Sequence, residues 1–132
     1  CAGCHNGVVL GGQMFQKFGI VKDYWLATGS KEEELLKGRD KGRFHDTKNE
    51  ADAFIFKVQQ LRNVAVTPPY FHDGSVATLG EAVRVMAAVQ LGREDLSDGD
   101  VADIVAFLES LTGEVPANFA AAPVLPPAPY RN

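Results

Sequence analysis

Residues 1–5, Cys1-Ala2-Gly3-Cys4-His5, have the residue types and the spacing of a covalent attachment site for a c-type haem. Two thiols at this spacing can each add to a vinyl group of one porphyrin, and the next side chain, His5, is then held beneath the iron as its proximal ligand. A redox dithiol does not need the histidine, and it usually accompanies an alternating strand–helix pattern that is absent here. A zinc site needs four ligands, and the sequence has no second cysteine pair. The motif therefore predicts one haem c, bound by Cys1, Cys4 and His5.

The second axial ligand of the iron decides the chemistry of such a haem. The candidates are Met14, Met86, His45 and His72, and a tyrosine is a further alternative. Met14 follows His5 closely and would have to round the porphyrin edge quickly, whereas His45 lies in a polar loop typical of a surface histidine. Met86 lies on an apolar helix face, where a methionine usually fills space, but a thioether ligand favours ferrous iron and raises the reduction potential. His72 suits a hydrogen bond to the backbone or to a haem propionate better than iron ligation. The residues alone leave the choice between Met86 and His72 open.

Other residues are expected to surround the porphyrin. The Gly-rich segment from Asn6 to Ile20 is predicted to be a loop that wraps it. The apolar side chains of this loop that we expect against the ring are Val8, Val9, Leu10, Phe15 and Phe18. Arg43 and Arg62 are candidates for pairing with the propionates, although each is equally consistent with an ordinary surface charge.

The composition suits one globular domain. The chain has 132 residues, of which 45% are hydrophobic, and no apolar run approaches the roughly 20 residues that would span a bilayer. Lys and Arg number 13 against 17 for Asp and Glu, and the net charge of −4 argues against nucleic acid as a partner. Both cysteines belong to the haem motif. Haem c is typically attached outside the bacterial cytoplasm, so we expect a periplasmic protein.

Local signals along the chain predict a mostly α fold with long loops. The charged stretch 31–43 suits a short solvated helix, but a surface turn with no function is the preferred interpretation. The paired prolines exclude helix from the irregular segment 61–74, where Asp73-Gly74 marks a turn. Thr78 with Glu81 predicts a capping box that opens a helix to about Leu91, before Gly92. Ser97 with Asp100 opens a second helix, and Gly113 is its expected stop. The second helix has an apolar stripe formed by Val101, Ile104, Val105, Leu108 and Leu111.

These elements predict a cytochrome c-like haem domain over residues 1–113, followed by an extended, Pro-rich C-terminal tail over residues 114–132. Small haem domains normally have a helix that leads into the attachment motif and packs against the last helix. Nothing precedes Cys1 in this sequence. We therefore expect the chain to be part of a longer protein, without its leading helix.

Several segments in order resemble the C-terminal half of the bacterial di-haem cytochrome c peroxidases, a family that also contains the di-haem enzyme of tryptophylquinone maturation. The resemblance covers almost the whole chain. The segments that carry it are Cys4-His5-Asn6-Gly7 with Gly11-Gly12-Gln13, Asp40-Lys41-Gly42-Arg43-Phe44, Leu61 to Gly74, Ala82 to Met86, and the final helix.

The resemblance implies specific roles. His5 and Met86 would be the axial ligands of the high-potential, electron-accepting haem, and the methionine separates this chain from the maturation enzyme, which has a tyrosine there. A calcium ion between the family's two haem domains would be bound partly by the backbone carbonyls of Thr67 and Pro69. The family's low-potential peroxidatic haem and its acid–base residues belong to an N-terminal domain. That domain is not in this sequence, which has one Cys-x-x-Cys-His motif.

The implied mechanism gives the two haems different tasks. A small donor protein, a cytochrome c or a cupredoxin, would deliver an electron to this domain, and the other haem would reduce hydrogen peroxide to water. An iron with histidine and methionine ligands has no vacant position, so this domain should not bind peroxide itself. A homodimer is also expected. Two other functions stay open: a self-sufficient monohaem electron carrier, and a haem sensor in which Met86 dissociates to admit a gas.

Overall fold

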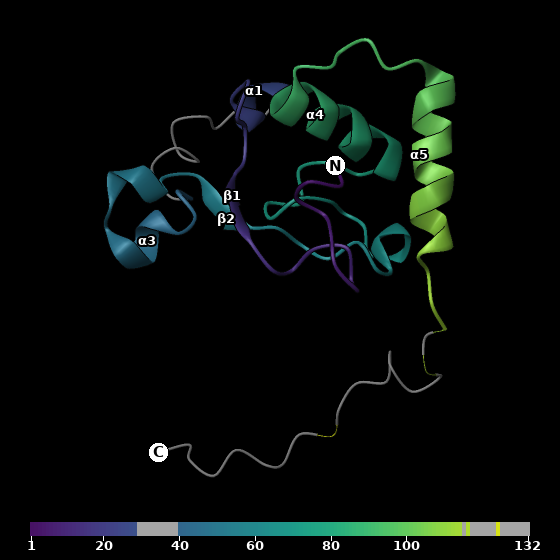
Figure 1. The fold of residues 1–132 in the computed structure, drawn as a ribbon, viewed down its shortest axis with the longest axis horizontal. Helices are drawn as coiled ribbons and strands as arrows, with labels where there is room; N and C mark the ends of the chain where they lie inside the picture. Colours follow the sequence, from purple (N-terminus) through teal and green to yellow (C-terminus); the bar gives the residue numbers. More distant parts are fainter. Residues whose placement is uncertain (29–39, 115, 117–123, 125–132) are drawn as a thin grey trace.

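The computed structural model describes residues 1–28, 40–114, 116 and 124 (Figure 1). The charged stretch 31–43 lies mostly outside the described residues, as does the expected extended tail. Within the described residues most regular structure is helical, and a short two-stranded sheet accompanies it. The elements are β1 (Phe15–Lys17), α1 (Tyr24–Ala27), α3 (Phe44–Thr47), a 3₁₀ turn (Glu50–Asp52), β2 (Ile55–Lys57), a second 3₁₀ turn (Val64–Val66), α4 (Leu79–Leu91) and α5 (Asp98–Ser110).

Helix α4 forms where the capping signal predicts it. The Thr78 hydroxyl accepts a hydrogen bond from the backbone N–H of Glu81 at 3.3 Å, and the Glu81 carboxylate accepts one from the N–H of Thr78 at 3.2 Å. The helix ends at Gly92, whose φ of 66° is a left-handed conformation that glycine adopts without strain. The helix packs against α5 and α1. It buries Ala82, Ala87 and Val89.

Removing the cap at Thr78 should weaken the fold measurably. We expect Thr78→Ala to lower the free energy of unfolding by about 1 kcal/mol, because the backbone N–H of Glu81 loses its acceptor. Urea unfolding followed by circular dichroism measures this change. Thr112→Ala is the matched control, since Thr112 is exposed just beyond α5. A loss as large in the control would show that the cap contributes nothing.

Helix α5 also has its predicted start. Ser97 and Asp100 form a second capping box, and Val101 and Leu108 are buried. The predicted stop was wrong, because α5 ends at Ser110 rather than at Gly113. The N–H of Gly113 instead donates to the side-chain oxygen of Asn63 at 2.8 Å, which ties the segment after α5 to the 61–74 loop.

Arg84 anchors the link between α4 and α5. Arg84 on α4 donates to the backbone oxygen of Leu96 at 3.0 Å and pairs with Asp98 at the start of α5. These contacts fix the connecting loop at the point where the chain turns into α5 (Figure 1).

The two strands correct the prediction that residues 6–20 are loop throughout. Strand β1 pairs antiparallel with β2, and Phe15, Gln16 and Lys17 lie opposite Lys57, Phe56 and Ile55. Each strand has only three residues, and the two are distant in sequence. No turn residues join them into a recognisable hairpin, so local sequence signals did not reveal the pair.

The core beside this sheet is aromatic. Its buried members are Phe18, Tyr24, Trp25 and Val89, and partly buried residues packed against them are Phe54, Phe56, Phe71, Val85 and Met86. Phe18 stacks on Tyr24 with ring centroids 4.3 Å apart, and it lies 5.1 Å from the ring of Phe71. Phe18 is therefore a buried member of the protein core, and its expected contact with the porphyrin stays a prediction. We call the buried residues Phe18, Tyr24, Trp25 and Val89 the aromatic cluster.

The segment 61–74 is irregular, as its prolines predict. It contains the 3₁₀ turn Val64–Val66 and no longer helix. Tyr70 is buried, and its N–H donates to the oxygen of Val76 at 2.7 Å. The expected turn at Asp73-Gly74 is confirmed, since Gly74 has a φ of 66° and its N–H donates to the oxygen of Phe71 at 3.3 Å.

Candidate haem site

The attachment motif folds into a single turn. The N–H groups of Cys4 and His5 both donate to the backbone oxygen of Cys1, at 3.0 and 2.8 Å. Positions three and four residues apart lie on one face of a helical turn, so this turn places both thiols and the imidazole on the same side. Both cysteines are free thiols, with Cys1 exposed and Cys4 half-buried. Free thiols beside an imidazole are the donor set that covalent haem attachment needs.

The orientation of His5 suits iron ligation. Its Nδ1 lies 3.1 Å from the backbone oxygen of Gln59. Because a carbonyl only accepts hydrogen bonds, Nδ1 carries the proton and Nε2 keeps its lone pair. Burial lowers the pKa of His5 below its ordinary value of 6.5, although hydrogen bonds to the backbone of Leu10 and Gln59 oppose that shift. The imidazole is therefore neutral near pH 7, which is the form that binds a metal.

The segment that contains Gln59 is fastened to the loop after the motif by backbone hydrogen bonds. The N–H of Gly12 donates to the oxygen of Val58 at 2.7 Å, and the N–H of Leu61 lies 3.2 Å from the oxygens of Val9 and Leu10. The oxygen that orients His5 is thus part of a rigid backbone arrangement. Sequence analysis missed this contact, because any residue supplies a backbone oxygen.

The two methionines lie in different settings. Met86, on α4, is half-buried and packs against the aromatic cluster. Met14 is 37% exposed, and its backbone oxygen accepts from the N–H of Val58 at 2.9 Å, which continues the β1–β2 pairing. Of the two thioethers, Met86 is the one placed on a capped helix, which can hold a ligand in a fixed position.

His72 is engaged by other side chains. Its Nε2 lies 2.8 Å from a carboxylate oxygen of Asp40 and 3.1 Å from the hydroxyl of Tyr24. Its ring stacks on Phe56, with centroids 4.4 Å apart and planes 24° apart. A carboxylate only accepts, so the proton on Nε2 points at Asp40 and that nitrogen has no lone pair to offer. These contacts favour the structural interpretation of His72.

The buried Tyr24 should make stability fall at alkaline pH. Burial, together with the negative charges of Asp40 and Asp73, raises the pKa of Tyr24 above its ordinary value of 10.0. The folded protein then holds a proton that the unfolded chain loses, so this stabilisation is complete below pH 10.0 and is lost as the pH rises above it. Urea titrations at increasing pH should show a decline above this value. In Tyr24→Phe the decline should be shallower by up to about 1.4 kcal/mol per pH unit, and an identical slope would contradict the assignment.

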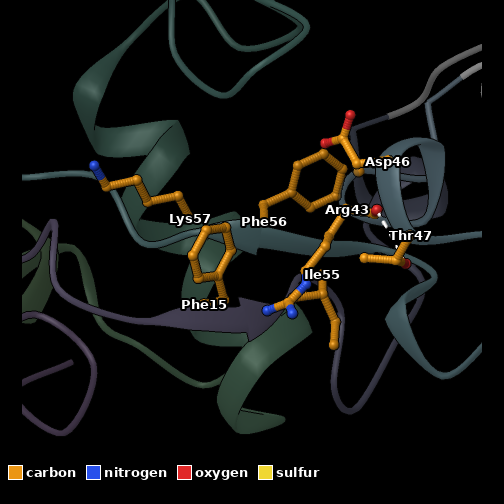
Figure 2. Close-up of a pocket in the computed structure, with 8 residues that line it drawn as sticks. Phe15, Arg43, Asp46, Thr47, Ile55, Phe56 and Lys57 are labelled. Atoms are coloured by element: carbon orange, nitrogen blue, oxygen red, sulfur yellow. Dashed lines mark hydrogen bonds between the residues drawn. The ribbon is translucent and has the colours of Figure 1, made fainter. Parts of the chain in front are cut away.

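Arg43, a predicted propionate partner, and Phe15, expected against the porphyrin, lie close together. Arg43 pairs with Asp52 at 3.5 Å and lies over the ring of Phe15, 5.3 Å from its centroid. These side chains sit beside an open groove of about 490 Å³, and Figure 2 shows Phe15 between Arg43 and Lys57. The residues that line this groove are Phe15, Gly42, Arg43, Asp46, Thr47, Ile55, Phe56 and Lys57.

Arg62 is exposed and has no ion pair with any residue that the structure describes. The Nε2 of His45 accepts from the N–H of Lys41 at 3.0 Å, in agreement with its expected surface role. Thr67 and Pro69 are exposed, and the hydroxyl of Thr67 donates to the oxygen of Val64 at 3.2 Å. Within the described ranges no group of three or more His, Cys, Asp or Glu side chains is arranged to hold a metal ion.

In the part of the chain that the structure describes, no helix combines the length and the apolar character needed to cross a bilayer.

A helical domain built around a Cys-x-x-Cys-His turn, with its histidine bonded to a backbone oxygen, defines a c-type cytochrome. The chain is 47% identical over 116 residues to the cytochrome c551 peroxidase of Pseudomonas aeruginosa, which covers 88% of this chain and 31% of that protein. It is 46% identical over 128 residues to the cytochrome c551 peroxidase of Nitrosomonas europaea, covering 97% of this chain and 34% of that protein. The chain belongs to the bacterial cytochrome c peroxidase family, and it spans about a third of the length of these two relatives.

Two further comparisons agree with this assignment. The cytochrome c peroxidase Ccp of Escherichia coli is 47% identical over 113 residues, covering 86% of this chain and 23% of that protein. The crystal structure of a MauG-like protein associated with microbial copper homeostasis superposes with a TM-score of 0.67 and 28% identity, over 90% of this chain and 45% of that one. No family model matches the chain.

Proposed function

We propose that this chain is the electron-accepting, high-potential haem domain of a cytochrome c peroxidase that reduces hydrogen peroxide to water. The observation that carries the proposal is a neutral, oriented His5 within the attachment turn of a chain that is 47% identical to a cytochrome c551 peroxidase. When bound, a c-type haem with histidine and methionine ligands supplies reversible one-electron transfer at high potential.

In this proposal the protein side chains bind the haem and fix the orientation of its iron ligands. Cys1 and Cys4 would hold the haem through thioether bonds, and His5 would offer Nε2 to the iron while its Nδ1–H stays bonded to Gln59. Met86 would be the second protein ligand of the iron, which its position on the capped helix α4 beside the aromatic cluster supports. Two protein ligands leave no open coordination position, so peroxide would react elsewhere in the whole protein.

The proposed electron donor and the proposed second haem domain are inferred from the same family. The relatives are named for cytochrome c551, which supports a small cytochrome as the donor, with a cupredoxin as the other small donor protein that suits this role. In this proposal the peroxidatic haem lies in an N-terminal domain outside this chain, so the whole protein has two haems. The proposal also includes a periplasmic location and a homodimer. The haem domain comprises residues 1–113 and the tail residues 114–132.

Two further assignments complete the proposal. Arg43 and Arg62 pair with haem propionates. The backbone oxygens of Thr67 and Pro69 contribute to a calcium site that bridges to the N-terminal domain, and the exposure of both residues leaves them accessible for this contact.

The second candidate is a monohaem electron carrier. The observation that favours it is the single Cys-x-x-Cys-His motif in the printed sequence. A carrier would exchange electrons with partner proteins and would turn over no peroxide.

Intact mass and haem content of the purified protein separate the two candidates. The peroxidase proposal expects a protein much larger than the 14.2 kDa of this chain, with two haems and peroxide-dependent oxidation of a reduced cytochrome. A single-haem protein near this mass, without that activity, would overturn it and support the carrier. Carbon monoxide binding to the ferrous protein, at the haem of this chain, would instead indicate a gas sensor.

A further inference from the structure

We propose that Gly11 is a positioning residue for His5: its missing side chain lets the backbone oxygen of Gln59 approach the imidazole and fix the orientation of the iron ligand. This inference rests on the proposed role of His5 as a haem ligand. It concerns two parts of the chain that no sequence signal connects, since Gln59 follows His5 by 54 positions.

The space around Gly11 admits no side chain. Gly11 is buried, and a Cβ atom there would collide with the backbone oxygen of Gln59 while lying 2.8 Å from the carbonyl carbon and 3.0 Å from the Cα of Gln60. Real Cβ atoms essentially never approach other atoms more closely than 3.0 Å. The atom that would collide is the same oxygen that accepts the hydrogen bond from His5 at 3.1 Å.

The neighbouring backbone prevents the two segments from separating. On one side of Gly11 the N–H of Gly12 donates to Val58, and on the other the oxygen of Leu10 accepts from Leu61. The N–H of Gly11 itself donates to the oxygen of Asn6 at 2.8 Å, only one residue after His5. A side chain at Gly11 must therefore displace the Gln59 oxygen rather than move the whole loop.

The displaced oxygen would change the properties of the ligand. A hydrogen bond from Nδ1–H to a carbonyl increases the basicity of the imidazole, holds the ring in one orientation and fixes its tautomer. Greater basicity stabilises ferric over ferrous iron, so the contact lowers the reduction potential. Loss of the contact should raise the potential and free the ring to reorient.

The test is Gly11→Ala in the full-length, haem-loaded protein, with Gly12→Ala as its matched control. Gly12 also has a positive φ, of 82°, but its Cβ would lie 3.9 Å from the nearest side-chain atom, Cγ2 of Val9. Both substitutions strain the backbone, and only the first meets the Gln59 oxygen. Gly3→Ala, where nothing lies within 4 Å, adds an unstrained control inside the motif.

Two readouts follow the His5 contact directly. Nitrogen-15 NMR of labelled histidine should show faster exchange of the Nδ1 proton in Gly11→Ala than in the natural sequence, because the displaced Gln59 oxygen no longer accepts that proton. Spectroelectrochemistry should show a raised midpoint potential in the same variant. Gly12→Ala should leave both values near those of the natural sequence. Equal changes in the two variants, or none in Gly11→Ala, would overturn the proposal.

One measurement needs no variant. In the natural sequence the Nδ1 proton of His5 should exchange slowly with solvent, and a freely exchanging proton would overturn the proposal even if Gly11→Ala does not fold. This outcome is distinct from failure of the proposed function. A protein with haem and peroxide turnover but an unprotected Nδ1 proton refutes only the role of Gly11, whereas a protein without peroxide turnover refutes only the peroxidase assignment.

Discussion

Replacing Met86 by alanine should abolish the near-infrared sulfur-to-iron charge-transfer band of the oxidised protein. The same substitution should lower the midpoint potential by roughly 0.1 to 0.3 V, a part of the ≈0.8 V range over which axial ligands set haem potentials. The physical reason is that a thioether stabilises ferrous iron, and its loss removes that preference. Near-infrared absorption and a redox titration of the holoprotein measure the two effects.

Two control variants make this result specific. Met14→Ala removes the chain's other thioether, which is 37% exposed, and should leave the band intact. His72→Ala removes the imidazole that contacts Asp40 and Tyr24; it should cost stability without removing the band. A band that persists in Met86→Ala would show that Met86 does not bind the iron, and its loss in Met14→Ala would identify the other methionine.

Phe18→Ala should be among the most destabilising single substitutions. Phe18 stacks on Tyr24 and contacts the rings of Phe56 and Phe71. Its removal from the aromatic cluster should cost about 3–5 kcal/mol of unfolding free energy, because the rings around the cavity can only partly collapse. Urea unfolding of the holoprotein gives this value, and the absorption spectrum of the folded variant should be unchanged.

Val8→Ala is the control for Phe18→Ala, since both residues come from the loop expected to face the porphyrin. Val8 is 91% exposed, so its truncation should change stability by less than about 0.5 kcal/mol. A haem spectrum altered by Phe18→Ala, together with a small loss of stability, would place Phe18 at the porphyrin instead of in the core.

Local signals predicted the two long helices well. The capping boxes at Thr78 and Ser97 each involve residues three apart, so sequence alone specifies where α4 and α5 begin. The end of α5 was harder to predict, because it depends on a hydrogen bond between Gly113 and the distant Asn63. The attachment motif could also be identified from the sequence, because its chemistry depends on five consecutive residues.

The surroundings of the motif depend on contacts that sequence does not encode locally. The partner of His5 is a backbone oxygen, and any residue in place of Gln59 would provide one. The network of Tyr24, His72 and Asp40 joins three separate segments, so no spacing rule relates its members. Phe18 has the same residue type as a haem-facing aromatic, and only its packing against Tyr24 shows that it belongs to the core.

The pairing of the first twelve residues with residues 58–61 has a consequence for how the protein is made. The cysteines leave the ribosome or an export channel long before Gln59, which follows His5 by 54 positions. Until then β1 has no partner strand and His5 lacks the carbonyl of Gln59. A contact of such sequence separation needs closure of a long loop before it contributes stability, so we expect the thiols to stay accessible during this interval. The window in which a haem-attachment system can reach an unstructured motif is thus set by the length of chain that must emerge before the site closes.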